Sequence, residues 1–462
     1  MLAIAVLLAA AQPATLRLDY FHTGDAREER YALDAVVREG PWPGPPDRRV
    51  DDTNLGRYLF EVRDAKGGEA LYSRGFASIF GEWETTAEAK ERPRGFHESV
   101  RFPEPAAPVM VTIKKRDAHG AFQTAWSVRV DPADPAIDRR HPPGVKVWAV
   151  MKNGEPVDKV DLLLLGDGYT ASEMDKWHRD ATRLAETLFA VSPFRVHRAQ
   201  FNVWAADTPS EDSGISRPSD GVHKRSALGT TYDAFGSERY VLNFDNKRLR
   251  EVASAAPYEF IEIVANDRKY GGGGIHNLYA TVSADNAFTP YVFVHEFGHH
   301  FAGLADEYYT SPVAYEPSTA AAERPEPWEP NATADPQAGK WRDLVSAGVP
   351  LPTRWPKEEF EAAQREIQAR RRKLREEKRP EAEMEALFRE ERERMSRLLG
   401  SAAQAGKVGA FEGAIYEAKG YYRPQIDCVM FSRNDVPFCA VCRRAIERII
   451  DLYAGRAAGK PR

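Results

Sequence analysis

The sequence predicts an α+β protein in which an N-terminal antiparallel β-sandwich precedes a larger domain with a twisted mixed sheet and an inserted helical hairpin. Up to about residue 134, apolar residues alternate with polar ones and are interrupted by turns rich in Gly, Pro and Asp. From residue 147 onwards, continuous apolar runs are followed by segments with helical periodicity. Residues 357–399 are crowded with charged side chains around a sparse apolar repeat. A chain of 462 residues is also too long for one hydrophobic core.

The chain begins with a short apolar run, from Met1 to Ala11, that ends in small side chains. This pattern is typical of a secretory signal peptide, although no basic residue precedes the run. The alternatives are a first core strand and a misassigned start codon. We expect residues 1–14 to be a signal peptide that is cleaved near Ala11 or Ala14, and the mature protein to be secreted or periplasmic. The run is too short to span a bilayer and no longer one follows, so we expect no membrane span.

Residues 15–134 are predicted to form the β-sandwich. Leu16, Leu18 and Tyr20 alternate with polar residues, and the same period recurs at 109–113. This segment contains no group of residues that suggests catalysis or metal binding. We therefore expect the domain to act as a spacer, a folding aid or a weak contact for substrate. The proline-rich residues 135–146 are predicted to be a linker to the second domain.

The second domain, residues 147–462, opens with a continuous apolar run at 160–165 that predicts a buried strand. The turn at 166–168 precedes a helix predicted at 171–190, and further strands are expected at 201–204 and 258–264. The turn has neither a Walker lysine nor the spaced glycines of a nucleotide site, so we interpret it as a tight turn. The net charge of −5 leaves no basic surface, and we expect no nucleic-acid partner.

The stretch that carries chemistry is an H-E-x-x-H motif at His295, Glu296 and His299. On a helix this spacing brings both imidazoles to one face, which suits two positions of a tetrahedral zinc ion. Glu296 can then accept a proton from water as a general base without binding the metal. Gly303 lets the chain leave the helix in a left-handed conformation. The third ligand is then an acidic residue, either Asp306 or the neighbouring Glu307.

The segment from His295 to Tyr309, H-E-F-G-H-H-F-A-G-L-A-D-E-Y-Y, resembles the active-site segment of the M64 peptidases, a family named for a bacterial IgA peptidase. Further segments agree with this resemblance, which covers about residues 147–453: 165–170, 270–274, 409–414, 421–424, 428–430 and 438–442. The resemblance implies a metzincin-like zinc endopeptidase that acts on proteins or peptides through a zinc-activated water. In metzincins, however, the glycine and the third ligand each come one residue earlier than here. With this shift the resemblance favours Asp306 as the third ligand, with Glu307 as the alternative.

The same resemblance implies roles for residues on either side of the motif. Gly272, Gly273 and Gly274 would form the sheet edge that pairs with an extended substrate, although a flexible surface loop is an equal alternative. Met430 would form the methionine turn beneath the metal, as a packing platform and not as a ligand. Tyr422, or its neighbour Tyr421, would stabilise the oxyanion with its phenol.

The three cysteines, Cys428, Cys439 and Cys442, lie within fifteen residues. In an oxidising compartment Cys428 could pair with either of the others and leave one thiol. In a reducing compartment the three thiolates could hold a metal, although no histidine is near in the sequence. We prefer one structural disulfide.

An insertion is predicted at residues 311–405. Its first part, up to residue 356, is interpreted as an irregular loop held by tryptophans. Residues 357–399 predict two helices separated by Pro380, which pack as a hairpin. We expect a charged structural insert; the alternative is an arm that contacts a partner or gates the substrate. A last amphipathic helix is predicted at 437–453.

Two other classes of function remain open at this point. One is a zinc hydrolase of a non-peptide amide, such as a cell-wall or amino-sugar bond. The other is a binding or adhesion protein with a residual zinc site, which the intact Glu296 argues against. The sequence does not identify the substrate.

Overall fold

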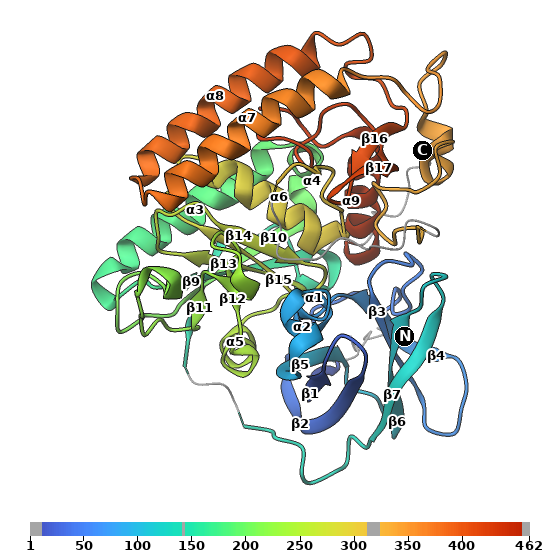
Figure 1. The fold of residues 1–462 in the computed structure, drawn as a ribbon. Coiled ribbons are helices and arrows are strands. Elements are labelled where there is room, and N and C mark those ends of the chain that lie inside the picture. Colours follow the sequence, from blue (N-terminus) through green and yellow to red (C-terminus); the bar gives the residue numbers. More distant parts are fainter. Residues whose placement is uncertain (1–11, 141–143, 312–323, 455–462) are drawn as a thin grey trace, which may run out of the picture.

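A computed structural model describes residues 12–140, 144–311 and 324–454. Figure 1 shows the N-terminal domain (blue) packed below a larger mixed α/β domain, with the helical hairpin α7–α8 (orange) at the opposite end of the molecule. The chain is therefore α+β, as predicted. No helix in the described ranges is both long and apolar enough to cross a membrane. The predicted signal peptide at 1–14 lies almost wholly outside the described residues, and strand β1 begins at Ala14.

The N-terminal domain consists of two antiparallel sheets that share one core. One sheet has the order β2-β1-β5 and the other β4-β3-β6-β7. Leu16, Leu18 and Tyr20 of β1 are at most 1% exposed and pack with Val111 and Ile113 of β6. Arg17 and Asp19 between them are buried as well, where they form an ion pair. The elements of this domain are β1 (Ala14–Gly24), β2 (Glu29–Pro41), β3 (Tyr58–Asp64), β4 (Ala70–Phe76), α1 (Ile79–Trp83), α2 (Ala87–Glu91), β5 (Arg94–Pro103), β6 (Val109–Arg116) and β7 (Phe122–Val130).

The predicted linker is only partly a free connection. Ile137 is buried, and Asp138 exchanges backbone hydrogen bonds with β2 through Val36 and Arg38. The first half of this segment therefore belongs to the N-terminal domain. The chain enters the second domain at β8 (Lys146–Met151).

The central sheet of the second domain has six strands in the order β14-β15-β13-β9-β10-β8. The four inner strands are parallel, whereas the edge strands β8 and β14 are antiparallel to their neighbours. The sheet is thus mixed, as predicted. Its strands are β8, β9 (Val160–Asp167), β10 (Phe201–Asp207), β13 (Phe260–Ala265), β14 (Gly272–Ile275) and β15 (Tyr279–Ser283).

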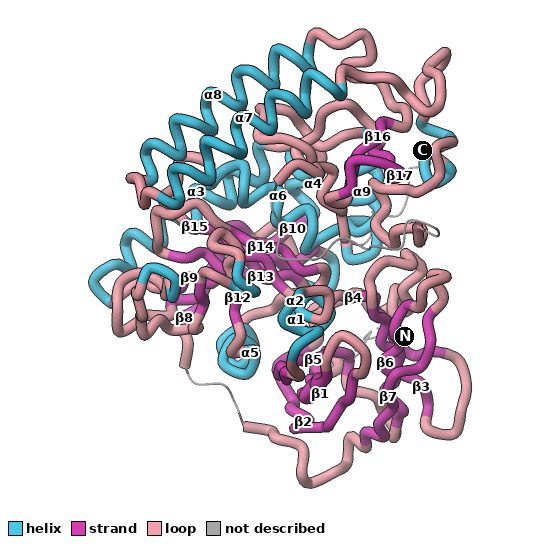
Figure 2. Tube along the Cα trace, viewed as in Figure 1, coloured by secondary structure: helices cyan, strands magenta, loops and turns pink. Residues whose placement is uncertain are grey.

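Both faces of this sheet are covered, which explains the unbroken apolar run of β9. Leu162 and Leu164 face a core formed with α3, α6 and α9, whereas Leu163 and Leu165 face α5 and the helix α1 of the N-terminal domain. Figure 2 shows the sheet edge-on with helices on either side. These helices are α3 (Met174–Ala190), α4 (Phe194–His197), α5 (Asn246–Ala253), α6 (Thr289–Ala302) and α9 (Ala440–Tyr453).

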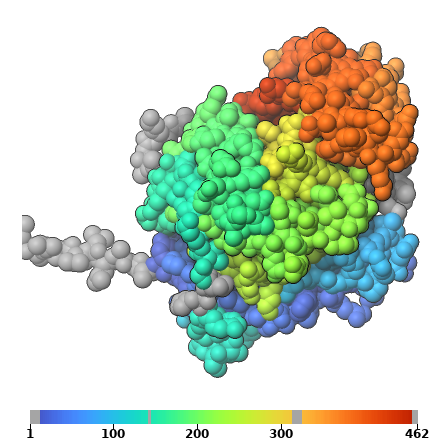
Figure 3. Space-filling view, turned by 90° about the vertical axis from the view of Figure 1, so that its left-hand side faces the viewer, coloured from blue at the N-terminus to red at the C-terminus, as the bar shows by residue number. Residues whose placement is uncertain are grey.

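The insertion forms the predicted hairpin, with α7 (Lys357–Glu376) and α8 (Glu381–Gly400) separated at Pro380. Phe388 packs edge-on against Phe288 at the start of α6, with ring centroids 5.5 Å apart. In the space-filling view the hairpin lies directly against the yellow and green surface of the second domain (Figure 3). A small hairpin follows it, β16 (Phe411–Ala414) and β17 (Glu417–Arg423). The suggested contact of the helical hairpin with a partner stays a prediction.

Candidate active site

Helix α6 carries the H-E-x-x-H motif and is fixed at both ends. Pro290 lies in its first turn, and the helix ends at Gly303, whose φ of 59° is the left-handed conformation predicted for the exit. His300, next to the motif, anchors the helix to the sheet. Its Nδ1–H donates to the Ile275 carbonyl (3.0 Å) and its Nε2 accepts from the Ile261 amide (3.1 Å). Burial lowers the pKa of His300 to about 3, so this ring is a neutral structural group.

Three ligand atoms converge on one point beside this helix. His299 Nε2 lies 3.1 Å from His295 Nε2, and Asp306 Oδ1 lies 3.0 Å from His295 Nε2 and 3.3 Å from His299 Nε2. Around a zinc ion with bonds of about 2.0–2.1 Å, tetrahedral ligand atoms are about 3.3 Å apart. The spacing therefore fits a single zinc ion.

The hydrogen bonds of the two rings also suit metal ligation. His295 Nδ1 donates to the Val429 carbonyl (3.0 Å), and His299 Nδ1 donates to the Leu304 carbonyl. With these tautomers both Nε2 atoms point at the Asp306 carboxylate, an arrangement that favours a cation, either a metal ion or a proton, between them. Burial by itself lowers the pKa of the His299 imidazole, but the neighbouring Asp306 carboxylate raises this pKa to about 9. Two imidazoles and one carboxylate form a donor set that zinc accepts, with a further position left for water or substrate.

The structure separates the two acidic residues that the sequence left as alternatives. Asp306 turns its carboxylate to the histidines. Glu307 turns the other way, where its Oε1 lies 3.3 Å from Cys442 Sγ and accepts a hydrogen bond from Asn331. Asp306 is therefore the only one of the pair that faces the histidines.

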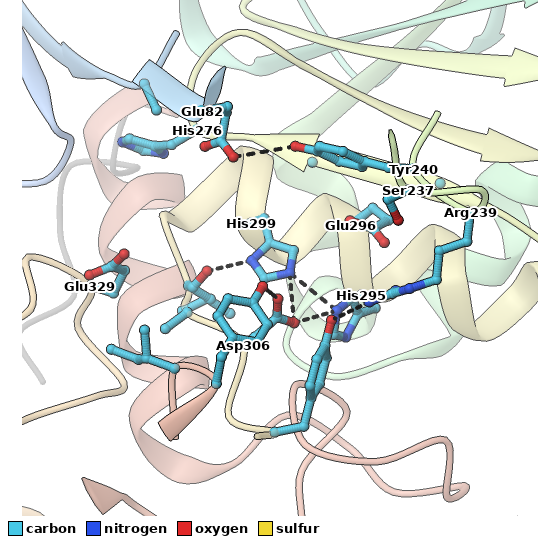
Figure 4. A pocket seen from close by; sticks show the side chains of 18 of the residues that line it. Glu82, Ser237, Arg239, Tyr240, His276, His295, Glu296, His299, Asp306 and Glu329 are labelled. Atoms are coloured by element: carbon cyan, nitrogen blue, oxygen red, sulfur yellow. Dashed lines mark hydrogen bonds and ion pairs between the residues drawn. The ribbon is translucent and has the colours of Figure 1, made fainter. Parts of the chain in front are cut away.

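The three ligands and Glu296 line an open cavity of ≈ 190 Å³. Figure 4 shows Glu296 beside Ser237 and Arg239, facing the same space as the two histidines. Burial raises the pKa of Glu296, and its two histidine neighbours act in the opposite direction. Further wall residues come from distant parts of the chain: Glu82 of α1, Arg239, Tyr240, His276, Tyr308, Trp328, Glu329 and Tyr416.

The N-terminal domain supplies part of this wall. Glu82 accepts a hydrogen bond from Tyr240 at 3.4 Å across the cavity (Figure 4). No sequence pattern indicates this contact, because α1 is only five residues long and contains no motif.

Tyr422 does not reach the cavity, so its predicted role is corrected. It lies in β17, where its backbone pairs with Thr333. Tyr416, in the turn between β16 and β17, lines the cavity instead and hydrogen-bonds through its hydroxyl to Asp306 Oδ2. Ile415 and Tyr416 have φ values of 50° and 61°, so the turn is a two-residue loop of the type that reverses a hairpin most tightly.

Of the three glycines before α6, only Gly274 is placed where the predicted pairing with substrate would require it. Strand β14 is a sheet edge, but the Gly272 amide and carbonyl already bond to Arg239 and Val241. Gly273 does not line the cavity, whereas Gly272 and Gly274 do. A Cβ at Gly274 would lie 2.2 Å from the Glu296 carbonyl, so glycine is required where β14 lies directly on α6. An exposed edge for pairing with substrate is thus limited to Gly274.

Met430 lies against the active-site helix, as its predicted packing role requires. A Cβ added to Gly298 of α6 would meet the Met430 sulfur at 3.0 Å. The same turn holds His295 through the Val429 carbonyl, and the Met430 carbonyl accepts from the Glu307 amide at 2.9 Å. Met430 is fully buried and is not among the residues that converge on the metal position.

The predicted disulfide is not formed. Cys428, Cys439 and Cys442 are buried free thiols, and the sulfurs of Cys428 and Cys442 are 3.9 Å apart. A disulfide requires about 2.05 Å.

Comparison with family models accounts for nearly the whole chain. The model described as IgA Peptidase M64 matches residues 148–450, and the one described as Peptidase M64 N-terminus matches residues 9–127. A search of curated proteins finds no match. The first match spans more than half of the chain and contains the histidine pair, Glu296 and Asp306 at the cavity. The chain therefore belongs to the M64 family of peptidases.

Proposed function

We propose that this protein is a secreted, zinc-dependent endopeptidase with a metzincin-like active site. The observation that carries the proposal is the convergence of His295 Nε2, His299 Nε2 and Asp306 Oδ1 beside Glu296 in an open cavity. The match to the peptidase family supports hydrolysis of peptide bonds in particular.

Each residue of the site has a defined task in this proposal. Zinc, when held by His295, His299 and Asp306, would acidify a water molecule and polarise a peptide carbonyl. The Glu296 carboxylate accepts a proton from the attacking water and passes it to the leaving amine. The Val429 and Leu304 carbonyls keep both imidazoles in the tautomer that presents Nε2. The free edge at Gly274 aligns an extended peptide along the cavity.

Replacing Tyr416 by Phe is expected to weaken zinc binding at this site by about 10- to 100-fold, because partners that orient a metal ligand typically contribute this much. The hydroxyl holds Asp306 through Oδ2 while Oδ1 faces the histidines. The measurement is the free zinc concentration at half-maximal activity, set with a chelator buffer. Tyr422→Phe is the matched control, since that side chain does not line the cavity, and should keep the wild-type midpoint. Equal midpoints for wild type and Tyr416→Phe would contradict this role.

The proposal as a whole is tested by incubating the purified protein with unfolded casein and with a mixed peptide library. We expect cuts at internal peptide bonds that a chelator abolishes and zinc restores. Cleavage confined to non-peptide amides would instead support the alternative function, a zinc hydrolase of non-peptide amide bonds. Zinc binding without any cleavage would establish a binding protein.

Export is tested on the same protein expressed in a bacterium with its natural N-terminus. We expect activity in the periplasmic or culture fraction, with the N-terminus trimmed near Ala11. A cut there leaves β1 intact, because Pro13 and Ala14 already bond to the folded domain through Trp42 and Glu104. Activity confined to the cytoplasm with an intact Met1 would refute export.

A further inference from the structure

A second group of metal-binding side chains lies behind the active site. It consists of Glu307, Cys428, Cys439 and Cys442, whose ligand atoms all lie within 4.8 Å of one another. All four side chains are buried, at most 3% exposed. The group shares no residue with the site formed by His295, His299 and Asp306.

The distances within this group match a tetrahedral site with sulfur ligands. With zinc–sulfur bonds of about 2.3 Å, two sulfurs would be about 3.8 Å apart, and a sulfur and an oxygen about 3.5 Å. The Cys428 and Cys442 sulfurs are 3.9 Å apart, and Glu307 Oε1 lies 3.3 Å from Cys442 Sγ and 3.8 Å from Cys439 Sγ.

The backbone around the sulfurs is arranged for thiolates. Cys428 Sγ accepts from the amides of Met430 (3.5 Å) and Cys439 (3.2 Å). Cys439 is the N-cap of α9, and its sulfur accepts from the amide of Cys442 (3.4 Å) in the first turn. Amide donors and a helix N-terminus both favour negative sulfur.

Glu307 is the fourth member of this group, and the hydrogen bonding of its carboxylate is incomplete. Its Oε1 accepts from Asn331 Nδ2 at 3.0 Å, but its Oε2 has no hydrogen-bond partner among the described residues. A buried, ionised carboxylate beside three thiols is costly, and a metal ion between them would remove that cost.

We propose that Glu307, Cys428, Cys439 and Cys442 bind a structural zinc ion, separate from the catalytic position. Three sulfurs and one oxygen in a dry, closed site with four protein ligands favour zinc in a structural role over metals that prefer oxygen. A redox role would need access for a partner thiol, which burial of all three sulfurs prevents.

The second zinc would fix the turn that supports the first site. Cys428 lies one residue before Val429, whose carbonyl orients His295, and the Glu307 amide donates to Met430 in the same turn. Four ligands from three separate segments would join the chain after α6, this turn and the start of α9. The inference does not depend on peptidase activity.

The test is the zinc content of the full-length protein, purified under reducing conditions, loaded with zinc and then desalted. We expect about two zinc ions per chain in the wild type and about one in a His295→Ala, His299→Ala double variant. X-ray absorption of that double variant should show sulfur neighbours at about 2.3 Å. A Cys428→Ser, Cys442→Ser double variant should lose the sulfur neighbours of zinc in the same measurement. Ser432→Ala is the control, because it changes the same turn without removing a ligand, and it should keep them.

Several results would overturn the inference. Zinc absent from the histidine double variant, or present there without sulfur neighbours, would exclude the site. A single reactive thiol after denaturation with chelator and without reductant would show a disulfide instead of a thiolate cluster. The histidine double variant keeps the test decisive even where the cysteine variants fail to fold. Because zinc and sulfur are measured without substrate, an inactive wild type would count against the proposed peptidase and not against this site.

Discussion

Glu296→Gln is expected to bind zinc normally and to lose about 10²- to 10⁴-fold in kcat/KM, the usual contribution of a general acid–base residue. Glutamine has the same shape but cannot accept the proton from water or return it to the leaving amine. The side chain faces the cavity beside the ligands and is not one of the three converging atoms, so metal binding should not change. The measurements are zinc content and the rate of cleavage of a fluorogenic peptide.

The matched control for this substitution is Glu359→Gln, the same chemical change at an exposed position of α7. It should leave both the rate and the zinc content at wild-type values. Cleavage by Glu296→Gln at the wild-type rate would remove Glu296 from the mechanism. Loss of zinc in that variant would show that the carboxylate acts as a ligand.

Asp306→Ala is expected to abolish both activity and zinc binding at the catalytic position. The carboxylate supplies one of three protein ligands and the only negative charge among them, so its loss should exceed the about 10- to 100-fold effect of a supporting residue. Two imidazoles alone would then face one another at 3.1 Å. Zinc content and the zinc dependence of activity measure the effect.

Glu307→Gln distinguishes the two acidic residues. Its side chain faces the cysteines, so the catalytic position should keep its zinc affinity, measured as the free zinc concentration at half-maximal activity. The opposite pattern, with catalytic zinc retained in Asp306→Ala and lost in Glu307→Gln, would show that the ligand assignment is wrong.

The parts of the site that the sequence predicted are those encoded locally. His295, Glu296 and His299 lie within five residues on one helix, so helical spacing alone places the two histidines on one face. The exit at Gly303 depends on the conformational freedom of a single glycine. The helical hairpin and the strand at β9 follow from the period and the length of their apolar patterns.

The parts that the sequence missed depend on contacts between distant segments. Tyr416 reaches Asp306 from 110 residues away, through a tight turn whose backbone also bonds to the chain after α6. Tyr422, six residues on, is an equally plausible tyrosine in the sequence but points elsewhere. Glu82 enters the cavity only because the two domains pack together.

For the cysteines too, the sequence left alternatives that depend on contacts between distant segments. Their spacing of eleven and three residues allowed either a disulfide or a metal site. The proposed zinc site depends on Glu307, which is more than a hundred residues earlier in the sequence and joins the three cysteines only after the chain has turned at Gly303.

The sequence by itself determined the group of residues at the centre of this protein: two histidines and a glutamate on one helix, two acidic residues close behind, and membership in a peptidase family. Only the tertiary structure decided that Asp306 turns to the histidines while Glu307 turns to the cysteines. The physical reason is that helical periodicity fixes side-chain direction over one or two turns. Beyond the helix, direction depends on which distant backbone groups the chain bonds to, here the carbonyl of Met430 and the amide of Ile415.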